Sequence, residues 1–164
     1  AATGCLIAST TRPKRCTRLL FAPAFSLDES ATARRVLIVA DKFGDVWSWV
    51  PSGNQSSAAS LEGRHLLGHT SATITCMATT HDGRLLLTGD RVERVRVSHF
   101  PNTCLIKSYL LRHTDFVAAV TAVSPPATLG RVSAPTLVAT AGGDGMVGLW
   151  DASTGDLLSW LDVR

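Results

Sequence analysis

At 164 residues, the chain has room for about one domain of ordinary size, since domains cluster near 100–150 residues. Hydrophobic residues make up 45% and charged residues 18%, which excludes a disordered polyelectrolyte. The net charge of +3 is too small to drive nucleic-acid binding alone. No stretch reaches 18 consecutive apolar residues, so a membrane-spanning helix is excluded. Residues 1–11 lack the features of a signal peptide.

The apolar segments are short and rich in Val, Ile, Leu and Thr, with Gly, Asp, Asn or Pro at their ends. The clearest examples lie at 35–40, 74–78, 85–88 and 137–140. Residues 95–98 alternate between Val and a polar residue, as a half-buried strand does. Helix signals are nearly absent. This pattern predicts an all-β protein.

The predicted strands repeat along the chain. Segments 41–49, 90–98 and 142–150 align without gaps, and their equivalent Val residues are 49 and 52 positions apart. His69 and His113 precede the second and third segments. A repeat of about this length, with a His at its start and Trp-Asp at its end, is typical of WD-repeat propeller blades.

The third repeat contains the four polar residues that link the strands of such a blade, namely His113, Thr140, Asp144 and Trp150. Hydrogen bonds among them give each buried polar group a partner. The second repeat retains His69 and Thr88 but has Val92 and Ser98 at the Asp and Trp positions. The first repeat retains Trp49 and has Phe43 at the Asp position. The sequence therefore predicts a degraded repeat, best preserved in its third unit.

We expect three blades, at about 16–51, 66–111 and 116–162, with 1–15 as a possible remnant of a preceding blade. A closed propeller has typically 4–8 blades. The sequence therefore predicts a partial WD-repeat β-propeller, a segment with an exposed sheet edge at each end.

Motifs for catalysis and metal binding are absent from the sequence. There is no Gly-x-Ser-x-Gly elbow, no paired-carboxylate motif and no metal-ligand spacing, so we expect neither an enzyme nor a metal site. The four cysteines, Cys5, Cys16, Cys76 and Cys104, form no Cys-x-x-Cys pair. We expect them to be reduced, packed thiols of an intracellular protein.

Two stretches point to one family of WD-repeat proteins. Residues 39–46 read Val-Ala-Asp-Lys-Phe-Gly-Asp-Val and resemble its VADKxGDV box, while residues 87–98 resemble its LTADRDEKIRVS segment. Residues 67–69, 99–102 and 113–117 follow the family pattern in the same order. Over about 16–162, the chain resembles the non-catalytic WD-repeat subunit of the eukaryotic tRNA (guanine-N7)-methyltransferase.

This resemblance implies a nuclear scaffold that forms a heterodimer with a catalytic subunit. That partner would carry the S-adenosylmethionine site and methylate a guanosine in the tRNA variable loop, and this chain would need no cofactor. Contact of the chain with tRNA would be weak or indirect. A generic WD-repeat adaptor of another complex is the alternative.

The resemblance also selects partner-binding residues. In the family, basic side chains of the two boxes face the partner, which implies Lys42, Arg94 and Arg96 here. Arg91 and Glu93 lie in the same turn as Arg94 and extend this set to a charged rim. The alternative reading of these charges is a solvated face without a partner.

Two positions depart from the family pattern. Val92 replaces the usual Asp, which predicts the loss of a hydrogen-bond acceptor before Arg94. Gly89 replaces the usual Ala, which predicts a looser strand end. Separately, Arg12, Lys14, Arg15 and Arg18 form a basic cluster that either contacts tRNA phosphates or is simply the polar approach to a strand.

Overall fold

The computed structural model describes residues 14–25, 34–50, 63–123 and 136–164. Within these ranges the chain forms twelve β-strands and no helix, which confirms the predicted all-β class. The strands are β1 (Cys16–Phe25), β2 (Arg34–Asp41), β3 (Asp45–Trp49), β4 (Arg64–Gly68), β5 (Ile74–Thr79), β6 (Leu85–Asp90), β7 (Arg94–His99), β8 (Ile106–Leu111), β9 (Val117–Val123), β10 (Leu137–Gly142), β11 (Met146–Asp151) and β12 (Leu157–Asp162). No helix in this described part is long and apolar enough to cross a membrane.

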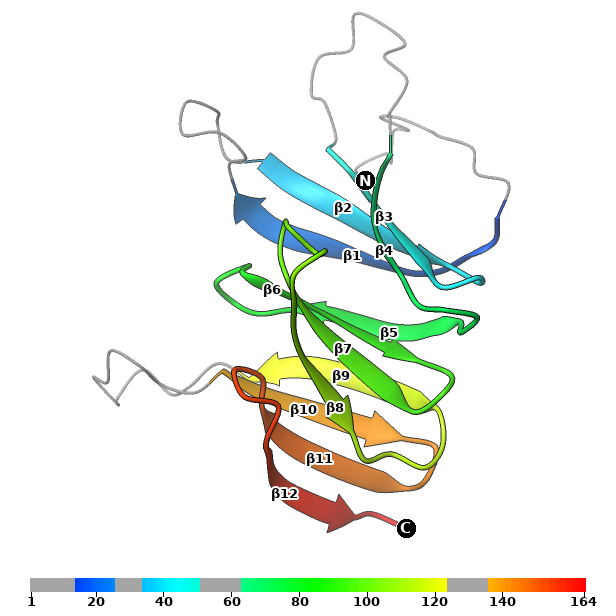
Figure 1. Ribbon diagram of the computed structural model, residues 1–164, viewed down its shortest axis with the longest axis vertical. Helices are drawn as coiled ribbons and strands as arrows, with labels where there is room; N and C mark the ends of the chain where they lie inside the picture. The colour runs from blue at the N-terminus through cyan, green and yellow to red at the C-terminus, as the bar shows by residue number, and fades with distance from the viewer. Residues whose placement is uncertain (1–13, 26–33, 51–62, 124–135) are drawn as a thin grey trace, which may run out of the picture.

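The strands form three antiparallel sheets of four, each built from consecutive strands: β1–β4, β5–β8 and β9–β12. The sheets are stacked face to face in chain order along the long axis of the molecule (Figure 1). Their first strands, β1, β5 and β9, are neighbours in space. Three four-stranded blades that meet at their first strands form a segment of a β-propeller.

The boundary between the first two blades differs from the sequence prediction. β4 pairs with β3, with Leu67 opposite Val46, so residues 64–68 complete the first sheet. The expected blades at 16–51 and 66–111 therefore divide the chain too early. The reason is that Gly68 and His69, read as one signature, serve different blades: Gly68 ends the outer strand of one sheet, whereas His69 bonds to the next. Most of the predicted remnant at 1–15 lies outside the described residues.

Two buried apolar clusters fill the spaces between the sheets. One joins the first and second sheets through residues such as Ile38, Leu67 and Leu86, and the other joins the second and third through residues such as Leu87 and Val138. β6 supplies both clusters because its alternate side chains point to opposite faces, which explains why the whole strand is buried. Each fully buried Leu or Val of this kind stabilises the fold by about 1.5–3 kcal/mol.

The thiols follow the prediction only in part. Cys16, Cys76 and Cys104 are free cysteines, but only Cys76 is buried, while Cys5 lies outside the described residues. Burial raises the pKa of the Cys76 thiol to about 11, against smaller opposing effects of hydrogen bonds. Cys76 therefore serves as a packed apolar residue at neutral pH.

Gly89 is explained by packing against the third sheet. A methyl group on its Cα would lie 2.4 Å from Cys76 Sγ and 3.0 Å from a methyl of Val117. β6 continues past this residue to Asp90, which is fully buried. The predicted loosening of the strand end is therefore wrong: the absence of a side chain at this position allows β5 and β9 to approach.

Replacing Gly89 by Ala should destabilise the protein by about 1–3 kcal/mol, because the added methyl overpacks the contact between the second and third sheets. The measurement is urea unfolding of the full-length protein followed by circular dichroism. The double variant Gly89→Ala, Cys76→Ala should recover part of the loss, since it removes the closest atom. Unchanged stability of Gly89→Ala would contradict this packing explanation.

Candidate protein-interaction site

Five connections between strands gather at one edge of the stacked sheets, on the right of Figure 1. They join β2 to β3, β4 to β5, β6 to β7, β8 to β9 and β10 to β11. We call this surface the turn edge; its residues are 42–44, 69–73, 91–93, 112–116 and 143–145. It carries Lys42, Arg91 and Glu93, three of the five partner-binding residues predicted from the sequence.

The predicted hydrogen-bonded chain is present in the third sheet. His113 Nδ1 lies 3.1 Å from both carboxylate oxygens of Asp144, and its Nε2 lies 2.9 Å from Thr140 Oγ1. Trp150 Nε1 donates to the same hydroxyl at 2.8 Å. The network assigns the proton of His113 to Nδ1, so that the Thr140 hydroxyl donates to Nε2.

The second sheet contains an equivalent chain with a different acid. His69 Nδ1 lies 2.9 Å from Asp90 Oδ2, and His69 Nε2 lies 2.8 Å from Thr88 Oγ1. The acid therefore comes from the end of β6 rather than from position 92 in the turn. Sequence alignment missed it because Asp90 is two positions earlier than the acid of the third repeat.

The third sheet shows why the two acids occupy different sequence positions. A Cβ atom on Gly142, which aligns with Asp90, would lie 2.5 Å from Asp144 Oδ1 and 2.4 Å from His113 Nδ1. The Asp144 carboxylate thus fills the space that a side chain at position 142 would need. Either position supplies the acid, and only one of them at a time can do so.

Asp90 also organises the turn that follows it. Its Oδ1 accepts hydrogen bonds from the backbone amides of Val92 at 2.8 Å and Arg94 at 3.0 Å. Its Oδ2 accepts a third from Arg94 Nε at 3.1 Å. The predicted loss of an acceptor at Val92 is therefore wrong, because Asp90 provides it.

The pKa of Asp90 reflects this set of donors. Burial raises the pKa of Asp90. The hydrogen bonds from His69 and from the amides of Arg94 and Val92 together lower it by more, so the pKa lies below its usual value of 3.8. The carboxylate is therefore ionised at neutral pH, as its pairing with Arg94 requires.

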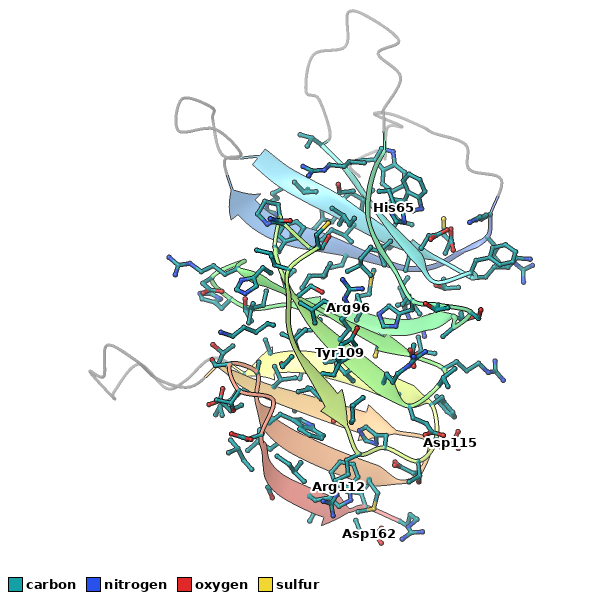
Figure 2. The ribbon with its side chains drawn as sticks, viewed as in Figure 1. His65, Arg96, Tyr109, Arg112, Asp115 and Asp162 are labelled. Atoms are coloured by element: carbon teal, nitrogen blue, oxygen red, sulfur yellow. The ribbon has the colours of Figure 1, made fainter. Side chains whose placement is uncertain are left out.

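Arg96 is placed differently from the other predicted contact residues. It is half-buried at the boundary of the first and second sheets (Figure 2). Its Nε donates to Ser98 Oγ at 2.9 Å and its Nη2 to the Thr103 carbonyl at 2.8 Å. Thr103 Oγ1 in turn donates to the Leu66 carbonyl of β4 at 2.6 Å. The structure thus gives Arg96 a role in joining two blades.

The remaining predicted residues are accessible. Lys42, Arg91 and Glu93 are exposed, and the Arg94 side chain is 41% exposed while paired with Asp90. Lys42 Nζ lies 4.8 Å from the centre of the Phe43 ring, a cation–π contact. The structure therefore places three of the five predicted residues on the turn edge and a fourth, Arg94, next to it at the start of β7.

Sequence reasoning missed three exposed apolar side chains on the same surface: Phe43, Val92 and Phe116, which are 55%, 51% and 40% exposed. Phe43 and Val92 lie in turns of the first and second sheets, and Phe116 lies in the connection from the second sheet to the third. The available signal was their position at turns, where Gly, Asn and Asp are the usual residues.

The basic cluster near β1 is only partly available for a ligand. Lys14 Nζ bonds to Asp45 Oδ2 at 2.6 Å, and this contact is the main reason why the pKa of Asp45 is lowered. Arg15 and Arg18 are exposed, and Arg12 lies outside the described residues. Within the described residues, no group of His, Cys, Asp or Glu could hold a metal ion.

Comparison with known proteins identifies related sequences. A family model described as the tRNA methyltransferase TRM82 WD40 domain matches residues 50–164. The chain is 34% identical over 163 residues to the tRNA (guanine-N(7)-)-methyltransferase non-catalytic subunit WDR4 of Mus musculus, covering 96% of this chain and 35% of that protein. It is 32% identical over 143 residues to the TRM82 subunit of Saccharomyces cerevisiae, covering 86% of this chain and 29% of that protein. The chain thus spans about a third of these relatives.

Solved structures support the fold. The crystal structure of the RRP9 WD40 repeats superposes with a TM-score of 0.64 at 19% identity, covering 93% of this chain and 40% of that one. The computationally designed Ika4 protein superposes with a TM-score of 0.63 at 20% identity, covering 99% of this chain and 82% of that one. Both likenesses concern the fold alone.

Replacing Asp90 by Asn should lower the free energy of unfolding by about 2–3 kcal/mol at pH 7, because charge-assisted bonds to His69 and Arg94 are lost. Since folding lowers the Asp90 pKa, its stabilisation is present above the usual value of 3.8 and is lost as the pH falls through the folded pKa. The free energies of unfolding of the parent and of Asp90→Asn should therefore approach each other as the pH falls below about 4. Asp156→Asn, in the exposed connection between β11 and β12, is the control with a small effect; a constant difference between Asp90→Asn and the parent at every pH would contradict the prediction.

Glu93 has a positive φ of 70°, and the equivalent residues of the other two blades are Gly44 and Gly145, with φ of 92° and 73°. Replacing Glu93 by Gly should raise stability by about 0.5–1 kcal/mol, since relief of backbone strain exceeds the entropic cost of glycine. Arg91→Gly changes a residue of the same turn that has no positive φ. It should lower stability by about 0.5–1 kcal/mol, because only the entropic cost of glycine applies there. Thermal unfolding compares the two, and equal losses would refute the strain argument.

Proposed function

Because this chain belongs to the family of the tRNA methyltransferase TRM82 WD40 domain, we propose that it is part of a non-catalytic scaffold subunit of a tRNA (guanine-N7)-methyltransferase. The scaffold binds a catalytic subunit as a heterodimer and holds it in the conformation that methylates a variable-loop guanosine. The turn edge is the surface that makes this contact. Its accessible charges and exposed apolar side chains are the observation that carries the proposal.

The turn edge is suited to binding because its backbone is fixed from within the blades. The Asp90 carboxylate holds the amides of Val92 and Arg94, and the Asp41 carboxylate holds those of Phe43 and Asp45. Such a turn presents its outward side chains without the entropic cost of ordering a loop on binding. A rigid edge with protruding side chains favours a protein partner.

The charges of the turn edge favour an acidic surface on the partner. Within the described residues, no salt bridge involves Lys42 or Arg91, so both cations are available to carboxylates of another chain. The Arg94 side chain stays partly exposed while its Nε bonds to Asp90. Guanidinium groups pair with carboxylates in a bidentate manner, which adds orientation to attraction.

The chemistry of methyl transfer belongs to the partner in this proposal. S-adenosylmethionine binds the catalytic subunit, and this chain binds no cofactor. Exposed Arg15 and Arg18 make at most weak contacts with tRNA phosphates. The complex is proposed to act in the nucleus, which a fluorescent fusion of the full-length protein would test.

A generic WD-repeat adaptor of another assembly remains the second candidate. The shape of the turn edge suits a protein partner of either kind. The two candidates differ in one measurable outcome: only the scaffold subunit changes tRNA methylation by its catalytic partner.

Reversing two accessible charges, with Lys42→Glu and Arg91→Glu together, should weaken binding of the full-length protein to its catalytic subunit by about tenfold or more, because like charges then meet across the interface. Affinity is measured by titration calorimetry, and N7-methylation of tRNA by transfer of labelled methyl groups. Both should fall together.

The matched control is Arg84→Glu, a reversal at the opposite edge of the second sheet, where the Arg84 side chain is 85% exposed. It should leave affinity and methylation unchanged. Equal behaviour of the control and the turn-edge variant, or full methylation by the catalytic subunit alone, would reject the scaffold role.

A further inference from the structure

Phe43 and Val92 occupy the same place in neighbouring blades. Each is the second residue after a carboxylate that ends a strand, and each donates its backbone amide to that carboxylate, at 2.8 Å in both cases. Their side chains are 55% and 51% exposed. The first two sheets therefore present the same kind of apolar side chain from the same position.

The two turns are tied together by one residue of the connection between β4 and β5. Thr73 Oγ1 donates to the Lys42 carbonyl at 2.8 Å, and the Thr73 carbonyl accepts from the Arg91 amide at 3.0 Å. Phe43 and Val92 each follow one of these anchored residues. Their separation and orientation are thus set by hydrogen bonds inside the protein.

The fold itself does not account for these two side chains. Neither belongs to the two buried apolar clusters of the described residues. The third blade has Asp144 at the equivalent position, where the carboxylate bonds His113 and the turn. In the first two blades Asp41 and Asp90 supply the carboxylate that holds the turn, which leaves positions 43 and 92 without that task.

Two lysines lie near Phe43, and Val92 stands in the chain between the exposed Arg91 and the exposed Glu93, so cations outnumber the single carboxylate. Lys42 Nζ and Lys14 Nζ lie 4.8 and 5.0 Å from the centre of the Phe43 ring. Arg91 is exposed next to Val92. An apolar centre with a basic rim is complementary to an apolar socket with an acidic rim.

We propose that Phe43 and Val92 are the apolar anchors of the turn edge and that they determine which catalytic subunit it accepts. This inference rests on the proposed scaffold function and identifies the partner surface as an apolar socket edged by carboxylates. Neither side chain is needed to hold its turn, because Asp41 and Asp90 supply the carboxylates. At position 92 the chain also differs from the family pattern resembled by its sequence, which has Asp there. Anchors of this kind contribute far more to affinity than the contacts around them.

The test compares two catalytic subunits, one from the same source as this chain and one from Saccharomyces cerevisiae. The full-length protein carries Phe43→Ser and Val92→Asp, alone and together, and affinities are measured by titration calorimetry. Ile106→Ser is the control, because Ile106 is 45% exposed on β8 at the end away from the turn edge. Circular dichroism of each variant checks the fold.

The double variant should bind its own catalytic subunit at least about tenfold more weakly, in line with the loss of anchor residues, while Ile106→Ser binds normally. Its affinity for the yeast subunit should equal or exceed that of the parent. The ratio of the two affinities is the readout of specificity, and it is insensitive to a general loss of stability.

Three outcomes would overturn the inference. The first is unchanged binding of the double variant Phe43→Ser, Val92→Asp while the charge-reversal variant Lys42→Glu, Arg91→Glu still loses binding. Charges alone would then make the contact, so the scaffold role would stand and the proposed anchor role would be rejected. Equal weakening toward both subunits would remove the role in specificity. Loss of self-association in sedimentation, with partner binding intact, would assign the surface to a second copy. If neither pair of variants affected binding, the proposed function itself would fail.

Discussion

A buried carboxylate at the turn between the second and third strands is the interaction on which each blade depends. In the second and third sheets it bonds a His from the preceding connection, and that His bonds a Thr hydroxyl in the middle of the sheet. The same carboxylate accepts hydrogen bonds from backbone amides of the turn. One ionised group thus fixes a connection, a strand and a turn at once. Because all its donors are internal, the turn edge is formed without help from a partner.

The three blades fill one equivalent space with different side chains. The strand register places Trp47 opposite Val39, Arg96 opposite Thr88 and Gly148 opposite Thr140. In the third sheet, Gly148 leaves room for the indoles of Trp150 and Trp160, which a Cβ atom would contact at 2.5 and 2.8 Å. In the second, Arg96 crosses Ser98 and reaches a carbonyl beyond it. The same register position thus carries an indole, a guanidinium and a glycine in the three blades.

The internal role of Arg96 and the exposure of its neighbours together define how this scaffold would work. Charges that stabilise the blades are half-buried and bonded within the chain, whereas those at the tips of turns point to solvent. Arg94 is intermediate, since Asp90 holds its Nε while part of its side chain stays exposed. In the proposed complex, Asp90 would couple partner binding to blade stability, because the same carboxylate holds the Arg94 side chain and the turn that carries Val92.

The sequence by itself determined the strand pattern, the repeat and the chain from His113 to Trp150, because these depend on local periodicity and on residues at fixed spacing. It also identified the charged turn through its resemblance to a family. Only the tertiary structure decided that β4 completes the first sheet and that Asp90 is the acid of the second. It also decided that Arg96 bonds Thr103, whose hydroxyl bonds the first blade. It alone showed that Thr73 ties together the turns that carry Phe43 and Val92. These features depend on contacts between residues of different sheets. The spacing of residues along one strand does not determine which residues of separate turns come close together.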